Sequence, residues 1–133
     1  MSEAVTQTHA REFFDYLEHI GDARTNIPLD ELEKHVLQDV VIESNGQPIC
    51  LNSKGFMEYA LENRKRFTKV SYRPSFEDAI YTYNSASIAF DVYCTTVDGK
   101  TVEYRAMAQI FFEGSKIKRW VEVVETVTEK YDA

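Results

Sequence analysis

Cysteine is scarce in this chain, which has only Cys50 and Cys94 among its 133 residues. Their number and separation give neither a disulfide framework nor the close spacing of a zinc site. The three histidines, His9, His19 and His35, fall in segments of helical pattern beside other polar residues, where surface positions are expected. Nucleophile elbows, phosphate-binding glycine loops and redox cysteine motifs are also missing. We therefore expect no metal and no cofactor.

Positive charge is in short supply as well. Fifteen lysines and arginines face 22 acidic residues, which gives a net charge of -7. This balance argues against a nucleic acid or an anionic membrane surface as the partner. The one basic cluster, Arg64-Lys65-Arg66, ends a predicted helix, where cations complement the helix dipole, and the alternative is a phosphate-binding patch.

The sequence also lacks long apolar runs. Residues 1–11 are polar and contain no apolar core of a secretory signal. No run approaches the roughly 20 apolar residues that cross a bilayer as a helix. We expect a soluble, cytoplasmic protein with reduced thiols, and the length favours a single domain over residues 1–133.

What is present is a helical pattern followed by a β pattern. Apolar residues recur at helical spacing in three segments, 8–20, 28–36 and 53–67. Branched and aromatic runs predict strands at 39–43, 70–76, 79–83, 88–97, 102–112 and 117–127. Helices that precede an antiparallel meander indicate an α+β fold, in which a curved antiparallel sheet wraps around the three N-terminal helices.

The dipeptide Asp98-Gly99 is the strongest turn signal and predicts a two-residue hairpin loop. Counting outward from it places three pairs on one face of the sheet: Tyr93 opposite Tyr104, Asp91 opposite Ala106, and Ala89 opposite Ala108. We expect this face to look inward, where the small alanines leave room for a ligand or for helix side chains. Asp91 would need a partner or a function there. The alternatives are a register shift that turns Asp91 outward, or a structural pair with Arg119 or a tyrosine.

The opposite face is also apolar, although the helices can cover only one side of the sheet. We expect a second copy of the chain to cover it, so that the protein is a homodimer. The predicted interface carries Phe90, Val92, Met107, Phe111 and Trp120. The alternative is a monomer whose outer face is only patchily apolar.

Three stretches carry a resemblance to a known superfamily. They are Val40-Val41-Ile42-Glu43, the following Ser53-Lys54-Gly55-Phe56-Met57, and Ile110-Phe111-Phe112-Glu113-Gly114-Ser115-Lys116-Ile117 at the end of the meander. In this order of elements the chain resembles the nuclear-transport-factor-2-like superfamily and, within it, the SnoaL-like group. The resemblance implies a cone-shaped α+β barrel with a deep pocket, commonly dimeric through the outer sheet face. Activities vary widely among proteins of this fold.

The resemblance also suggests positions for catalytic residues. Compared with ketosteroid isomerase, Tyr16 takes the place of the tyrosine on the first helix. The base that follows the first strand corresponds to Glu43 or to the next residue, Ser44, of which Glu43 is the acid. The protonated aspartate of that enzyme is replaced by Ala108. The segment Arg105-Ala106-Met107 lacks the carboxylate of the epoxide hydrolases. The reactions known for these relatives therefore do not carry over.

Two functions fit these observations. The first is a small-molecule pocket protein, with any chemistry of the cofactor-free acid–base type of an isomerase, cyclase or hydrolase, acting on a compact apolar ligand. Its predicted catalytic residues are Asp91, Tyr16 and Glu43, and its predicted ligand-binding residues are Tyr93, Tyr104, Ala106, Ala108, Phe56, Tyr59 and Arg119. The second is a non-catalytic dimeric binding module whose cone is filled by its own side chains.

Overall fold

The computed structural model describes residues 2–127. It contains the helices α1 (Glu3–Ile20), α2 (Leu29–Leu32) and α3 (Ser53–Asn63), and a short 3-10 helix η1 (Phe76–Asp78). The strands are β1 (Val36–Ser44), β2 (Gln47–Cys50), β3 (Phe67–Pro74), β4 (Ile80–Tyr81), β5 (Ser85–Thr96), β6 (Thr101–Glu113) and β7 (Lys116–Thr126). Over these residues, no helix is both long and apolar enough to cross a membrane.

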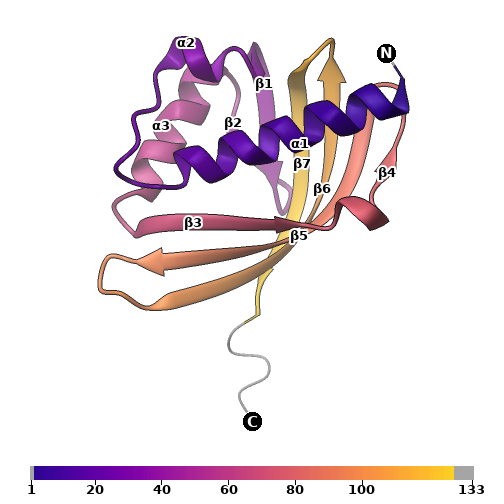
Figure 1. Ribbon diagram of the computed structural model, residues 1–133. Coiled ribbons are helices and arrows are strands. Elements are labelled where there is room, and N and C mark those ends of the chain that lie inside the picture. Colours follow the sequence, from indigo (N-terminus) through magenta and orange to yellow (C-terminus); the bar gives the residue numbers. More distant parts are fainter. Residues whose placement is uncertain (1, 128–133) are drawn as a thin grey trace.

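All seven strands form one curved sheet in the order β2-β1-β7-β6-β5-β3, and β4 pairs with β5. Helix α1 crosses the concave side, while α2 and α3 gather at the end near β1 and β2 (Figure 1). The predicted α+β class and the wrapping of the sheet around three N-terminal helices are confirmed. Two details differ from the prediction. The sheet does not close into a barrel, and β1 pairs with β7 in parallel, so the sheet is not wholly antiparallel.

Capping and burial explain where the helices begin and which side they bury. The Ser2 hydroxyl accepts a hydrogen bond from the Val5 amide at the start of α1, and Asn52 does the same for Gly55 at the start of α3. Helix α1 buries the predicted apolar stripe of Phe13, Leu17 and Ile20. The second predicted helix is shorter than expected, because Val36 already opens β1.

The predicted registers of the meander are wrong by one residue. Asp98-Gly99 does not form a two-residue turn of type I′ or II′, since both types need a positive φ at the first position. Only Gly99 has one, at 86°, and Thr96 and Lys100 close a three-residue loop through their backbones at 2.8 Å. Asp91 therefore pairs with Arg105, and Ala106 pairs with Phe90.

A bulge has the same effect on the next hairpin. The turn at Gly114-Ser115 pairs Glu113 with Lys116 as predicted, but the register shifts between Phe111 and Phe112. Beyond the bulge, Ala108 lies opposite Glu122 and not opposite Val121.

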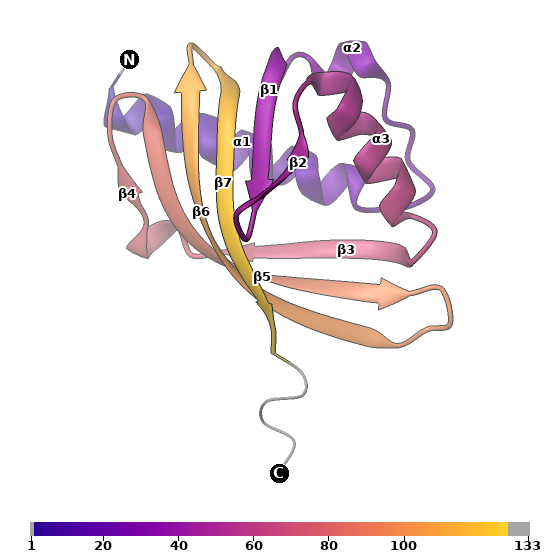
Figure 2. The same ribbon diagram turned by 180° about the vertical axis from the view of Figure 1, so that it is seen from behind.

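Because of these register shifts, some residues predicted on the outer face of the sheet lie on its inner face. Phe90, Val92 and Trp120, expected on the dimer interface, are buried in the core. Met107 and Phe111 remain outside on the convex face, where β5, β6 and β7 run side by side (Figure 2). Alternate residues of β5, from Ala86 to Cys94, face the helices.

Candidate functional site

A cavity of about 340 Å³ lies between the concave side of the sheet and the helices α1 and α3. Its volume is within the range of small-molecule sites, roughly 300–1,000 Å³. Most of its lining is apolar, and its polar and charged side chains come from different elements. The lining residues are Phe13, Leu17, Ile42, Ser44, Ile49, Cys50, Phe56, Tyr59, Asn63, Arg66, Phe67, Val70, Tyr72, Phe90, Val92, Cys94, Tyr104, Ala106, Trp120, Glu122 and Val124.

Aromatic rings fix one wall of the cavity. The ring of Trp120 lies 5.8 Å from Phe13, from Phe14 and from Phe90, measured between centroids. Phe14 and Phe90 are edge to face at 5.3 Å. Such tilted and edge-to-face contacts hold large rings in defined positions. The indole of Trp120 is therefore a rigid support for polar groups beside it.

The carboxylate of Glu122 is the acidic group of the cavity wall. One of its oxygens accepts a hydrogen bond from the Trp120 indole at 2.8 Å, and the other accepts one from the Ser44 hydroxyl at 2.9 Å. Because each carboxylate oxygen has two lone pairs, both retain a free acceptor position. Two fixed donors thus orient a carboxylate within a largely apolar cavity, an arrangement suited to a general base.

Asn45 holds the strand segment that carries Glu122. It follows β1 in the left-handed region, at φ 50°, and forms a two-residue turn with Gly46 at φ 80°. Its side-chain amide accepts from the Val124 amide at 2.9 Å and donates to the Val124 carbonyl at 3.1 Å. Its own backbone amide donates to the Glu122 carbonyl at 2.9 Å. The side chain thus replaces one peptide unit of β1 where that strand turns away.

Three titratable groups of the cavity, the Tyr72 phenol and the thiols of Cys50 and Cys94, are neutral at physiological pH. Burial, followed by the nearby Cys94 and Glu122, raises the pKa of Tyr72 well above its usual value, so its phenol remains a proton donor. Burial also raises the pKa of Cys50, and that of Cys94 to about 11. Both thiols are therefore protonated and poor nucleophiles or metal ligands. Among residues 2–127, no group of three or more His, Cys, Asp or Glu could hold a metal ion.

Four of the predicted ligand-binding residues line this cavity. They are Phe56 and Tyr59 from α3, and Tyr104 and Ala106 from β6. Tyr59 is 46% exposed and lies at the rim, whereas Ala106 is buried deeper. Ala108 is fully buried in the core and does not reach the cavity.

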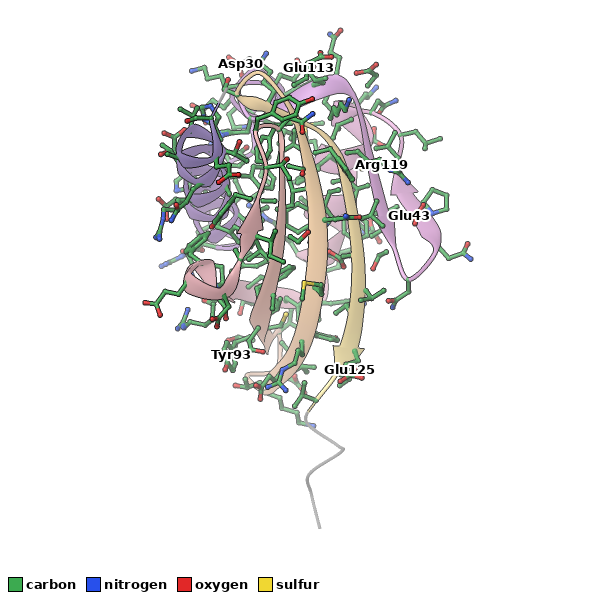
Figure 3. The ribbon with its side chains drawn as sticks, turned by 90° about the vertical axis from the view of Figure 1, so that its right-hand side faces the viewer. Asp30, Glu43, Tyr93, Glu113, Arg119 and Glu125 are labelled. Atoms are coloured by element: carbon green, nitrogen blue, oxygen red, sulfur yellow. The ribbon has the colours of Figure 1, made fainter. Side chains whose placement is uncertain are left out.

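Four other predicted residues lie outside the cavity. Asp91 forms an ion pair with Arg105 at 3.1 Å, so its expected inward position is wrong and the outward alternative is right. Tyr93 does not line the cavity, and its ring centroid lies 5.7 Å from the Arg73 guanidinium. Arg119 and Glu43 lie on the side of the sheet that faces away from α1 (Figure 3).

Tyr16 lies apart from both groups. It is buried and stacks on His35 with ring centroids 4.2 Å apart. Burial and then the negative charge of Glu31 raise the pKa of Tyr16 to about 12. Its hydroxyl has no hydrogen-bond partner within the described chain and does not line the cavity.

Sequence reasoning missed Glu122, Ser44 and Tyr72. Trp120 was predicted on the outer face, and Glu122 shares its face because side chains two apart on a strand point the same way. The signal that could have found it is Trp120 itself, because the one tryptophan of a small domain is usually in the core. A buried Trp120 carries Glu122 to the inside with it.

No family model matches the chain, and no curated protein matches it by sequence. Solved structures do resemble it. A SnoaL-like polyketide cyclase from Agrobacterium tumefaciens is 19% identical and superposes with a TM-score of 0.65 over 88% of each chain. An NTF2-like (nuclear-transport-factor-2-like) protein from Anabaena variabilis is 14% identical, with a TM-score of 0.73 over 92% of this chain and 91% of that one.

A candidate isomerase from Rhodopseudomonas palustris is 12% identical, with a TM-score of 0.72 over 89% of this chain and 90% of the other. At these identities the likeness shows the fold. The chain therefore has the NTF2-like, SnoaL-like fold, as its sequence indicated.

Proposed function

We propose that the cavity binds a compact, largely apolar carbonyl compound and that the protein catalyses a cofactor-free proton transfer on it, as an isomerase or cyclase does. The observation that carries this proposal is the Glu122 carboxylate, held by Trp120 and Ser44 in the wall of an apolar cavity. The names of two similar structures, a polyketide cyclase and a candidate isomerase, are consistent with this reaction class.

The proposed chemistry uses two groups of the cavity. Glu122 takes a proton from the carbon next to the substrate carbonyl, and the C–H electron pair moves into an enolate. The Tyr72 hydroxyl donates a hydrogen bond to the enolate oxygen, where negative charge develops. Return of the proton from Glu122 to another carbon gives an isomer. Attack of the enolate carbon on a second carbonyl instead closes a ring, and the new alkoxide receives the proton.

The test is the enzyme-dependent incorporation of deuterium from heavy water into a panel of cyclic and aryl ketones, followed by mass spectrometry. We expect the wild type to accelerate exchange and Glu122→Gln to lose the acceleration by about 10² or more, because the amide cannot accept the proton. Asp91→Asn is the matched control, since it removes the same charge from the outer face. Exchange that survives in a folded Glu122→Gln variant, or is lost equally in Asp91→Asn, contradicts the assignment.

A dimeric binding module remains a second candidate because of the outer face of the sheet. Met107 and Val123 are directly opposite each other on β6 and β7 and are 49% and 62% exposed. Exposed apolar pairs at the centre of a sheet face favour a protein partner. We propose a homodimer through this face, which is compatible with either function.

A further inference from the structure

The cavity lining contains two charged side chains, Arg66 and Glu122, within the part of the chain that the structure describes. Glu122 is on β7 beside β1, whereas Arg66 precedes β3 at the far edge of the sheet, beyond β6 and β5. From this separation we infer that the ligand carries an anionic group, a carboxylate or similar acid, that binds Arg66 at the cavity rim. This inference rests on the proposed function and adds the substrate class.

The three cations at the end of α3 have different roles. Arg64 donates to the backbone carbonyls of Ile20 and Asp22 at 2.9 and 3.2 Å, which ties α3 to the end of α1. Lys65 forms an ion pair with Glu62 at 3.0 Å. Arg66 is the member of the cluster that lines the cavity, and it forms no ion pair with any residue from 2 to 127.

Arg66 is held in a position to bind an anion. Its carbonyl accepts a hydrogen bond from the Val97 amide at 3.1 Å, which anchors its backbone to the end of β5. Its guanidinium lies over the ring of Phe67, 4.8 Å from the centroid, and Phe67 also lines the cavity. Stacking occupies one flat face of the guanidinium and leaves its N–H edge for a bidentate contact with an acid.

The charges of the cavity define the orientation in which such a ligand binds. Glu122 repels an anion, and the net charge of -7 gives the protein no general attraction for one. The acid group must therefore remain at Arg66, where Asn63 and Tyr59 add polar side chains to the rim. The apolar body then extends past Tyr72 toward Glu122, which presents the far end of the ligand to the proposed base.

Two fluorescent dyes with nearly the same apolar body provide the test. 1-Anilinonaphthalene-8-sulfonate carries an anionic group, and N-phenyl-1-naphthylamine does not. We expect Arg66→Gln to raise the dissociation constant of the sulfonate about tenfold relative to that of the neutral dye, in line with the loss of a charged hydrogen-bonded pair. The affinity for the neutral dye should stay unchanged. Lys65→Gln is the matched control, because it removes the same charge one residue away, outside the cavity lining.

Further outcomes separate this inference from the proposed function. Ala106→Leu fills part of the cavity with a larger side chain and should weaken the binding of both dyes if they bind there. If both dyes bind the cavity but Arg66→Gln and Lys65→Gln weaken the sulfonate equally, or neither does, the anion site is wrong and the cavity proposal stands. If neither dye binds the wild type, or Ala106→Leu leaves both affinities unchanged, both proposals fail.

Discussion

Tyr16 carries a hydroxyl that is buried without a hydrogen-bond partner among residues 2–127, while its ring stacks on His35 at 4.2 Å. Burying an unsatisfied hydroxyl costs free energy, and phenylalanine preserves the ring. We predict that Tyr16→Phe raises the free energy of unfolding by about 1 kcal/mol, measured by urea denaturation. The variant should leave ketone exchange unchanged, because Tyr16 does not line the cavity.

Ser53 supplies the contrasting case for that prediction. Its hydroxyl is also buried, but it donates to the Glu33 carboxylate at 2.8 Å. Ser53→Ala should therefore lower the free energy of unfolding by about 1 kcal/mol in the same experiment. If Tyr16→Phe destabilises the protein as much as Ser53→Ala does, the Tyr16 hydroxyl has a partner and the interpretation is wrong.

Among the structural elements, the two hairpin signals show how far sequence reasoning reached. Asn45-Gly46 and Asp98-Gly99 are both typical of two-residue turns, yet only the first forms one. At the second, the Thr96 hydroxyl bonds the Asp98 carboxylate and accepts from the Lys100 amide at 2.9 Å, which supports a wider loop. A single extra residue there was enough to turn Asp91 from the predicted cavity to the outer face.

The order of elements was predictable because periodicity and turn residues are local signals. The parallel pairing of β1 with β7 was not, since it joins residues as distant as Ser44 and Glu122 and no local pattern encodes it. This pairing brings the Ser44 hydroxyl to the Glu122 carboxylate. Strand-by-strand reasoning therefore could not bring Ser44 to Glu122, whereas it predicted correctly that Phe56, Tyr59, Tyr104 and Ala106 line the cavity.

The Asn45 turn allows a test of this junction between β1 and β7. Asn45→Gly keeps the left-handed backbone but removes the two side-chain bonds to Val124. We predict at least tenfold faster hydrogen exchange of the Val124 amide, measured by NMR, and slower ketone exchange because Glu122 is less well held. The amide of Val127, which donates to the Glu103 carbonyl, is the internal control. Unchanged protection of Val124 would show that Asn45 does not hold this strand.

For the whole molecule, the curvature of the sheet determines both proposed surfaces. The concave side encloses the cavity, and the convex side exposes the opposed pair Met107 and Val123. The helices formed by residues 2–127 cover only the concave side (Figure 1). Charged pairs such as Asp91 with Arg105 lie beside the apolar centre of the convex side, as in the apolar core and polar rim of protein interfaces.

A charge introduced on the convex face tests the homodimer proposed for it. A twofold interface through this face contains Met107 of both copies, so Met107→Glu buries two unpaired carboxylates in its apolar centre. We predict that the wild type sediments as a dimer and Met107→Glu as a monomer at the same micromolar concentration in analytical ultracentrifugation. Leu51→Glu is the control, because Leu51 is 66% exposed but lies between β2 and α3, off the convex face. A monomeric wild type, or a dimer that Met107→Glu leaves intact, would exclude this interface.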